Sequence, residues 1–164
     1  MIISGTALKL GDNIDTDVII SGKYLIIRNL DEVGKHVFEG IIPNFTNKIK
    51  ATSIIVGGKN FGCGSSREAA PMMLKYVGTK AIVADSFARI FFRNSINLGL
   101  PLLECKNISK ITDNDELELD LSNGRISNIT KNEEYSATKL PDFLLRMLEV
   151  GGAIEMLKRK IQEN

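Results

Sequence analysis

The chain has 164 residues, of which 43% are hydrophobic and 25% are charged, and its formal net charge is +1. This length and composition are those of a globular protein with a buried core, and they exclude a wholly disordered chain. Because proteins that bind nucleic acid or anionic membranes usually carry a basic excess, we expect neither kind of partner.

Cysteine and histidine are scarce: the chain has two cysteines, Cys63 and Cys105, and one histidine, His36. These ligands are too few for a zinc site or an iron–sulfur cluster, so we expect the chain itself to bind no metal or other cofactor. The N-terminal residues lack the features of a secretory signal, and no segment approaches the ~20 apolar residues of a membrane span. We therefore expect a soluble, cytoplasmic protein with reduced thiols.

In chain order, the loose alternation of residues 2–10 predicts an opening strand, and residues 31–38 are compatible with a short helix. Between them, three aspartates and two glycines surround a short apolar run at residues 18–20, which is typical of a loop. Three further apolar runs predict buried strands, at residues 52–56, 81–84 and 102–105. Helical spacing between these runs predicts two helices, at residues 72–77 and 87–98.

The last third of the chain has a different pattern. Residues 116–121 alternate strictly and lead through Ser122-Asn123-Gly124 into residues 125–130, which predicts an antiparallel hairpin with one wet face. Residues 142–160 predict two helical segments separated at Gly151-Gly152. Since no repeat or linker interrupts the chain, we expect residues 1–164 to form a single α/β domain with a small parallel core and an antiparallel extension.

The segment GGKNFGCGSSRE, residues 57–68, lies between a predicted strand and a predicted helix. Backbone N–H groups at such a turn attract anions, and the Arg67 guanidinium can bind a carboxylate with two hydrogen bonds. Ser65-x-x-Glu68 is also a capping box, which gives a purely structural alternative. Pro71 favours a helix that begins near Ala70 and leaves the serines exposed.

The motifs GDNIDTD (residues 11–17), KNFGCGSSRE (59–68) and DSFARIFFRNSINLGLPLLE (85–104) occur in this order. Together they resemble the small subunits of 3-isopropylmalate dehydratase, within the aconitase superfamily. The resemblance implies the swivelling β/β/α domain that is the fourth domain of aconitase, here as a separate chain. One departure is Ala69-Ala70, where the family commonly has His-Ala; it leaves the exact substrate open.

The resemblance also implies an activity. Enzymes of this family isomerise 2-isopropylmalate to 3-isopropylmalate in leucine biosynthesis, by dehydration and rehydration, and are hydro-lyases. Their large iron–sulfur subunit carries a four-iron four-sulfur cluster that acts as a Lewis acid. We therefore expect this chain to pair with such a subunit, in a heterodimer or heterotetramer, and to act on a small dicarboxylic or tricarboxylic hydroxy acid.

By the same resemblance, Ser65 is the base that removes the proton next to a carboxylate, and Arg67 pairs with a substrate carboxylate. Ser66 is a further substrate contact, and Asp17 orients a histidine of the large subunit. A serine alkoxide needs nearby hydrogen-bond donors, which we expect to be backbone amides at residues 64–67. The alternative is a non-catalytic anion-binding interaction module, and the presence of Ser65, Arg67 and Asp17 argues against it.

The pair Tyr24-Leu25 begins the loop that, in the family, reaches the variable group of the substrate. In homoaconitases an arginine commonly follows this pair, whereas Ile26 and Ile27 follow here. Branched apolar side chains fit an isopropyl group better than a carboxylate, which would be costly to bury without a partner. Arg28 leaves homoaconitate open, and citraconate or 2-methylmalate, and dimethylmalate, are further alternatives.

Other polar residues have simpler interpretations. Asp15 is expected to form a turn through a hydrogen bond to its own backbone. His36 is expected at the surface of a short helix, and Arg89 and Arg93 are expected to be solvated.

Overall fold

The protein is represented by a computed structural model that describes residues 1–162, without the side chains of residues 50–52. A seven-stranded sheet has the strand order β4-β3-β2-β1-β5-β6-β7. Four strands form its parallel half: β1 (Ile2–Lys9), β2 (Ser53–Val56), β3 (Ala81–Ala84) and β4 (Leu102–Glu104). Three antiparallel strands continue from β1: β5 (Glu116–Asp120), β6 (Arg125–Asn128) and β7 (Glu133–Ser136). This arrangement confirms the predicted α/β class and the antiparallel extension.

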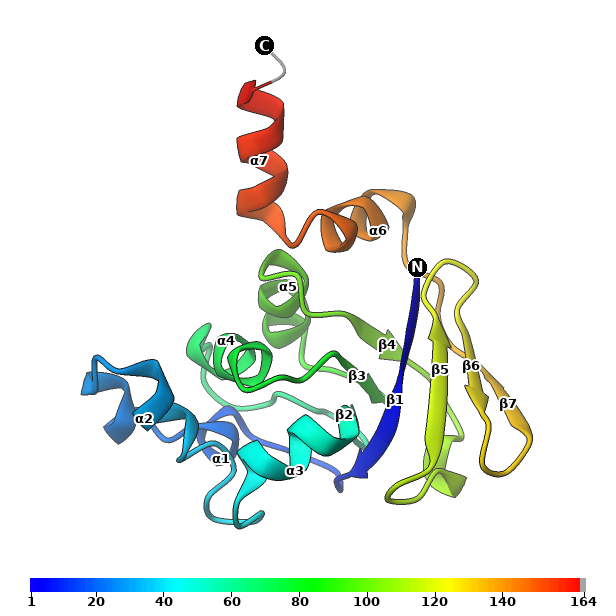
Figure 1. The fold of residues 1–164 in the computed structure, drawn as a ribbon, viewed down its shortest axis with the longest axis horizontal. Coiled ribbons are helices and arrows are strands. Elements are labelled where there is room, and N and C mark those ends of the chain that lie inside the picture. Colours follow the sequence, from blue (N-terminus) through cyan, green and yellow to red (C-terminus); the bar gives the residue numbers. More distant parts are fainter. Residues whose placement is uncertain (163–164) are drawn as a thin grey trace.

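Parallel neighbours need crossover connections, and helices provide them. Between β1 and β2 lie four helices: α1 (Thr16–Ile19), the 3₁₀ helix η1 (Gly22–Ile26), α2 (Leu30–Gly34) and α3 (Phe45–Thr52). The later crossovers are α4 (Ala69–Tyr76) and α5 (Arg89–Asn97). The remaining helices are η2 (Ile108–Lys110), α6 (Asp142–Glu149) and α7 (Ala153–Gln162). In Figure 1, α1 to α5 lie on the left side of the molecule, β5 to β7 lie on the right side, and α7 projects from the top.

The buried strands explain the apolar runs of the sequence. All residues of β2 and β3 are buried, as is usual for parallel strands that are covered on both faces. In contrast, buried and more exposed residues alternate along β5, because one face of the antiparallel half meets solvent. The predicted hairpin and its wet face are therefore confirmed.

Five elements were not predicted, namely α1, η1, α3, η2 and β7. The apolar run at 18–20 belongs mostly to α1, whose first turn is capped by the Asp15 side chain. β7 has the polar sequence EEYS and packs against the core through Tyr135, which pairs with Ile126 of β6. Among the residues that the structure describes, no helix is both long and apolar enough to cross a bilayer.

Candidate active site

The two motifs that carry the chemistry lie side by side. The segment before α1 runs parallel to the turn after β2, with a bridge between Asp15 and Cys63. Backbone hydrogen bonds join Gly62 N to Ile14 O (2.8 Å) and Thr16 N to Cys63 O (2.9 Å). Since backbone bonds fix the register of the two segments, the side chains that follow them are held at fixed relative positions.

Two glycines allow this close approach. Gly64 has φ of +91°, and a Cβ atom there would lie 2.2 Å from the Asp15 carboxylate. Gly62 has φ of +79°, and a Cβ atom there would lie 2.1 Å from the Phe91 ring. The Asp15 carboxylate also accepts a hydrogen bond from Asp17 N at 2.7 Å, which confirms Asp15 as a turn-forming residue.

Ser65, Arg67 and Asp17 form one hydrogen-bonded group. Arg67 Nη1 donates to Asp17 Oδ1 at 2.5 Å, and Arg67 Nε donates to Ser65 Oγ at 3.0 Å. The backbone of Ser65 is held as well, because the buried Thr16 donates its hydroxyl hydrogen to Ser65 O at 2.9 Å. The structure thus brings together the three residues that the sequence marked for catalysis and substrate binding.

This arrangement has clear chemical consequences. A guanidinium that donates to a hydroxyl oxygen favours the alkoxide over the hydroxyl, because it places positive charge beside the developing negative charge. The donor to Ser65 Oγ is the Arg67 side chain, where we expected backbone amides. Arg67 has five N–H donors, so three stay available for a ligand carboxylate while Asp17 fixes the plane of the fork.

Ser65 does not cap a helix. The N-cap of α4 is Glu68, whose side chain makes no capping hydrogen bond, and the helix begins at Ala69. Ser65 and Ser66 are exposed in the turn that precedes this helix. The capping-box alternative is therefore wrong, and the helix start agrees with the expectation from Pro71 to within one residue.

The segment that was predicted to reach the substrate begins beside Arg67. A Cβ atom on Gly22 would lie 2.7 Å from Arg67 Nη1, so η1 starts in contact with the guanidinium. Tyr24 and Ile27 pack against the core, whereas the side chains of Leu25 and Ile26 project outward, with 41% and 86% of each residue exposed. Arg28 is exposed too. The five residues of this loop thus divide into an inward and an outward set.

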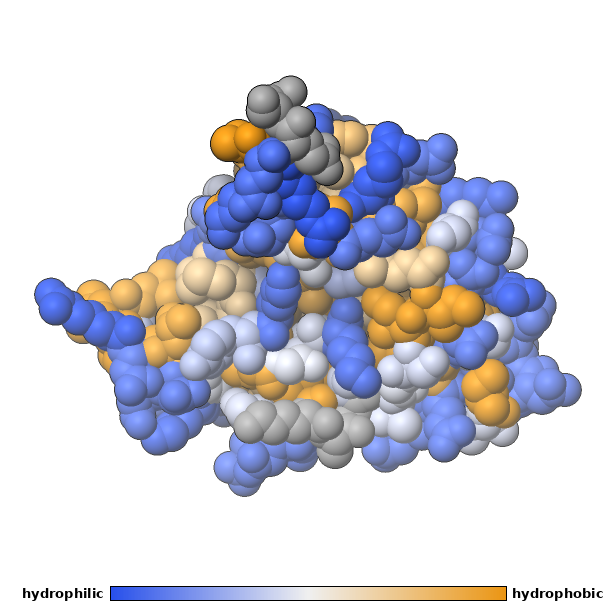
Figure 2. Space-filling model, turned by 45° about the horizontal axis from the view of Figure 1, so that its top comes forward, coloured by the Kyte–Doolittle hydropathy of each residue, from blue (hydrophilic) through white to orange (hydrophobic). Residues whose placement is uncertain are grey.

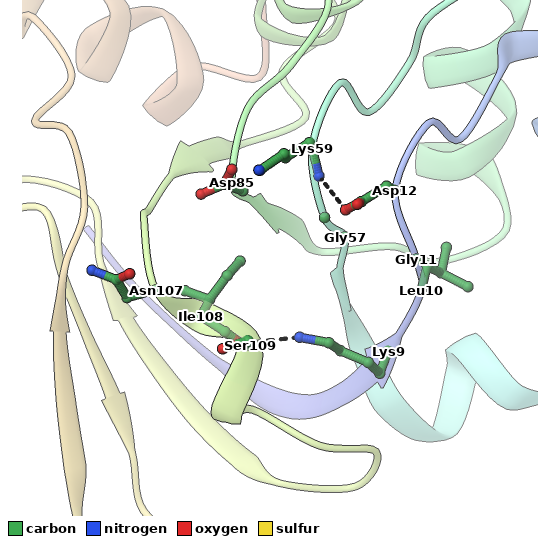
Figure 3. Close-up of a pocket in the computed structure, with 11 residues that line it drawn as sticks. Lys9, Leu10, Gly11, Asp12, Gly57, Lys59, Asp85, Asn107, Ile108 and Ser109 are labelled. Carbon is green, nitrogen blue, oxygen red and sulfur yellow. Dashed lines mark hydrogen bonds between the residues drawn. The ribbon is translucent and has the colours of Figure 1, made fainter.

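A cavity of about 440 Å³ lies at the carboxyl ends of β1, β2 and β3, and Figure 3 shows Lys9, Lys59 and Asp85 around it. Several of its polar groups already have partners within the protein. Lys9 Nζ donates to Ile108 O at 2.9 Å, Lys59 N donates to Asp12 Oδ1 at 2.7 Å, and Asp85 pairs with Lys106 at 3.9 Å. Asp12 holds the first part of the turn that leads to Ser65. We therefore interpret the polar groups that line this cavity as structural.

A second cavity, of about 370 Å³, adjoins Ser65, Ser66 and Arg67. Its opposite wall comes from α5 and includes Arg89, which we expected to be merely solvated, and Asn94. Sequence reasoning missed this wall, because the packing of Phe91 against Gly62 decides which face of α5 meets the turn. The i, i+4 spacing of Ile90 and Asn94, which both line the cavity, is the only signal for it.

The described residues offer no metal site. No group of three or more histidine, cysteine or acidic side chains is placed to hold a metal ion in this part of the chain. The two thiols form no disulfide: Cys105 is buried and Cys63 is half-buried. Burial, followed by the charge of Asp15, raises the pKa of Cys63, which disfavours the thiolate that a metal would bind.

Comparison with known proteins shows the family of the chain. Residues 14–108 match the family model of the aconitase C-terminal domain, so the fold is that of an aconitase-type C-terminal domain. The chain is 56% identical to 3-isopropylmalate dehydratase small subunit 1 of Archaeoglobus fulgidus over 154 residues, which are 94% of this chain and 96% of that protein. It is 52% identical to the 3-isopropylmalate dehydratase small subunit of Methanosarcina acetivorans, over 98% of this chain and 99% of that one. The chain therefore belongs to the family of 3-isopropylmalate dehydratase small subunits.

A solved structure has the same fold. The crystal structure of 3-isopropylmalate dehydratase from Methanocaldococcus jannaschii superimposes with a TM-score of 0.91 at 44% identity, over 99% of this chain and 98% of that one. The family resemblance that the three motifs predicted is thereby confirmed along nearly the whole chain.

Proposed function

We propose that this chain is the small subunit of a two-chain hydro-lyase that isomerises 2-isopropylmalate to 3-isopropylmalate. Relatives at about half identity or more over nearly the full length bear the name 3-isopropylmalate dehydratase small subunit. The observation that carries the proposal is the contact of Arg67 Nε with Ser65 Oγ at 3.0 Å, beside Asp17. A module that only bound anions would not need a hydroxyl oxygen placed against a guanidinium.

In the proposed reaction, Ser65 acts as the base. As an alkoxide it takes a proton from the carbon next to a substrate carboxylate, while the hydroxyl leaves the neighbouring carbon, takes a proton from a histidine of the large subunit and is released as water. On rehydration that histidine takes the proton back from the water that adds. Rehydration returns the proton and the hydroxyl to exchanged carbons, and Ser65 is then the proton donor. Arg67 lowers the cost of the alkoxide and offers its remaining N–H groups to a carboxylate. Asp17 keeps the guanidinium in place and has its second oxygen available for a histidine of the large subunit.

The four-iron four-sulfur cluster that the family resemblance implies does not fit this chain, because the described residues hold no ligand set for it. We therefore assign the cluster to the large subunit, with which this chain assembles. Ser65 and Ser66 lie at the exposed surface, as a site shared between two chains requires.

Substrate choice is proposed from the outward set of the loop. Leu25 and Ile26 present apolar surface in the same short helix as Gly22, which contacts Arg67, and apolar surface suits an aliphatic side group better than a third carboxylate. A relative from M. jannaschii, 50% identical over 99% of this chain, is named isopropylmalate/citramalate isomerase small subunit. The methyl-bearing acid citramalate is therefore the first alternative substrate to compare.

Replacement of the proposed base tests the mechanism directly. In the enzyme assembled with its large subunit, Ser65→Ala should lower kcat by at least about 10²-fold, because the Ser65 oxygen takes the proton in dehydration and gives it back in rehydration. The free energy of unfolding of the chain should stay within ~0.5 kcal/mol of wild type, since Ser65 is exposed and caps no helix. The measurement is hydration of isopropylmaleate, followed by its ultraviolet absorbance.

The matched control is Ser109→Ala, which changes another exposed serine, beside the separate cavity at the strand ends. This variant should keep wild-type turnover. Turnover of Ser65→Ala within a few-fold of wild type would contradict the assignment of Ser65 as the base.

A further inference from the structure

Tyr24 begins the loop that was predicted to reach the substrate, and two other side chains, His36 and Glu39, hold its ring and hydroxyl. The Tyr24 ring stacks on the His36 ring, with centroids 3.7 Å apart and an interplanar angle of 4°. The Glu39 carboxylate accepts hydrogen bonds from Tyr24 OH and, at 2.5 Å, from His36 Nδ1. Because a carboxylate only accepts, Nδ1 carries a proton. We call this group, Tyr24, His36 and Glu39, the Tyr24 clamp.

The Tyr24 clamp is charged as well as aromatic. Lys23 Nζ lies 4.6 Å from the centroid of the Tyr24 ring and 3.7 Å from Glu39 Oε1. The hydrogen bond from Tyr24, followed by the one from His36, lowers the pKa of Glu39, so the carboxylate is ionised at neutral pH. His36 therefore lies near the surface, but one face of its ring is covered by Tyr24.

The clamp fixes the backbone that presents Leu25 and Ile26. Tyr24 O accepts from Ile27 N at 3.1 Å, which closes a turn around these two residues. Tyr24 and Ile27 both pack against the core, whereas Ile26 makes so little contact that 86% of it is exposed. Figure 2 shows apolar surface gathered on the arm at the left, the side of the molecule on which Figure 1 labels α2. Ile26 is not held by packing of its own side chain, so its position depends on the turn between Tyr24 and Ile27.

We propose that His36 and Glu39 are positioning residues for substrate selection, which act through Tyr24 to hold Leu25 and Ile26 against the aliphatic side group of the substrate. This inference rests on the proposed function and assigns part of its specificity to two residues that touch no substrate. A loop that is ordered before binding loses less freedom when the substrate binds, so binding of the side group is strengthened without any change in the proton transfer at Ser65. The clamp lies at the surface, where its ionic contacts contribute little to the stability of the fold.

The test compares Glu39→Ala, Glu39→Gln and the control Glu32→Gln in the assembled enzyme. Glu32 pairs with Lys35 on the same surface and does not contact Tyr24. Glu39→Ala should lower the ratio of kcat/KM for isopropylmalate to kcat/KM for citramalate by about tenfold, mostly through KM, as expected for lost contacts with methyl groups. Glu39→Gln keeps an acceptor for Tyr24 OH and should fall between Glu39→Ala and wild type, while Glu32→Gln should match wild type.

A second measurement does not depend on activity. In the full small subunit alone, hydrogen exchange of the amides of residues 25–27 should be about tenfold faster in Glu39→Ala than in wild type, and unchanged in Glu32→Gln. If the wild-type enzyme is active but Glu39→Ala keeps its discrimination, or if exchange does not change, the clamp has no positioning role. If the assembled wild-type enzyme acts on neither acid, the proposed function itself fails.

Discussion

Arg67 connects the two segments of the proposed site. Its guanidinium contacts Asp17 from the first motif and Ser65 from the second, and its side chain is 27% exposed. A lysine could not make both contacts, because an ammonium is a single point on a flexible chain, whereas the guanidinium is a rigid planar fork. The position of this one group thus sets both the reactivity of the hydroxyl and the place where a carboxylate binds.

Gly22 controls that position, which leads to a prediction. A Cβ atom at residue 22 would lie 2.7 Å from Arg67 Nη1, so Gly22→Ala must displace the guanidinium. We expect kcat/KM of the assembled enzyme to fall by roughly 10- to 100-fold, as small misplacements of catalytic groups do. The free energy of unfolding should change by less than ~1 kcal/mol, because the end of a flexible side chain can move at low cost.

Gly40→Ala is the matched control for this variant. An added Cβ atom at Gly40 would meet no atom within 4 Å. Turnover assays and urea unfolding of both variants separate an effect on the site from an effect on the fold. Equal activity of Gly22→Ala and Gly40→Ala would show that Arg67 need not occupy its present position.

Among the helices and strands, those with a strong apolar pattern were predicted best. β3 occupies residues 81–84 as predicted, because a fully buried strand needs an unbroken apolar run. α3 and β7 were missed for the opposite reason. The sequence of β7 is mostly polar, and its pairing with β6 decides its conformation rather than any local preference.

Within the candidate site, too, some features could be predicted from the sequence and others could not. Ser65 and Arg67 could be predicted because they share one motif in a turn after a buried strand. The contact of Arg67 with Asp17 and the stacking of Tyr24 on His36 are products of tertiary structure. Asp17 meets Arg67 because the segments that follow β1 and β2 run side by side, and Tyr24 meets His36 within the crossover between those two strands. No spacing rule of the sequence encodes such contacts.

Glycines allow the end of helix α5 to approach the segment between α6 and α7 closely. This close contact leads to a second prediction. Gly99 ends α5 with φ of +76°, and a Cβ atom there would lie 2.3 Å from Gly151 O. Gly99→Ala should lower the free energy of unfolding by more than ~1 kcal/mol, because both the backbone conformation and the close approach to backbone oppose a side chain. Urea unfolding measures this, with Gly11→Ala, which meets no atom within 4 Å, as the control. Equal stability of the two variants would contradict the tight junction.

The two halves of the sheet are joined around Asp115, and this region makes the stability of the chain depend on pH. Burial alone would raise the pKa of Asp115, but hydrogen bonds from Thr112, Asn128 and Lys131 outweigh it and lower the pKa from 3.8 to about 2. The residue is 3% exposed. Since the folded pKa is below the unfolded one, the ionised form stabilises the fold above pH 4, approximately, by about 2 kcal/mol.

Protonation of Asp115 should therefore destabilise the fold at low pH. As the pH falls from about 4 through the folded pKa of about 2, the contribution of Asp115 is lost. The difference in free energy of unfolding between wild type and Asp115→Asn should therefore be about 2 kcal/mol larger at pH 6 than at pH 2. Denaturant unfolding at several pH values measures this difference. Asp113→Asn, at an exposed neighbour, is the control, and a difference that did not change with pH would contradict the role of Asp115.

Assembly with a large subunit gives the last prediction. Burial raises the pKa of Cys105 to about 11, with a further contribution from Asp85, and burial also raises the pKa of Cys63. Neither thiol is therefore prepared to bind iron as a thiolate, and the described residues contain no other ligand set. The isolated chain, reconstituted anaerobically with iron and sulfide, should thus hold no stoichiometric cluster and hydrate no isopropylmaleate. Addition of the cluster-bearing large subunit should restore hydration with wild-type chain and not with Ser65→Ala. Iron and sulfide analysis of each preparation tests the assignment, and a stoichiometric cluster on the isolated chain would overturn the division of labour between the two subunits.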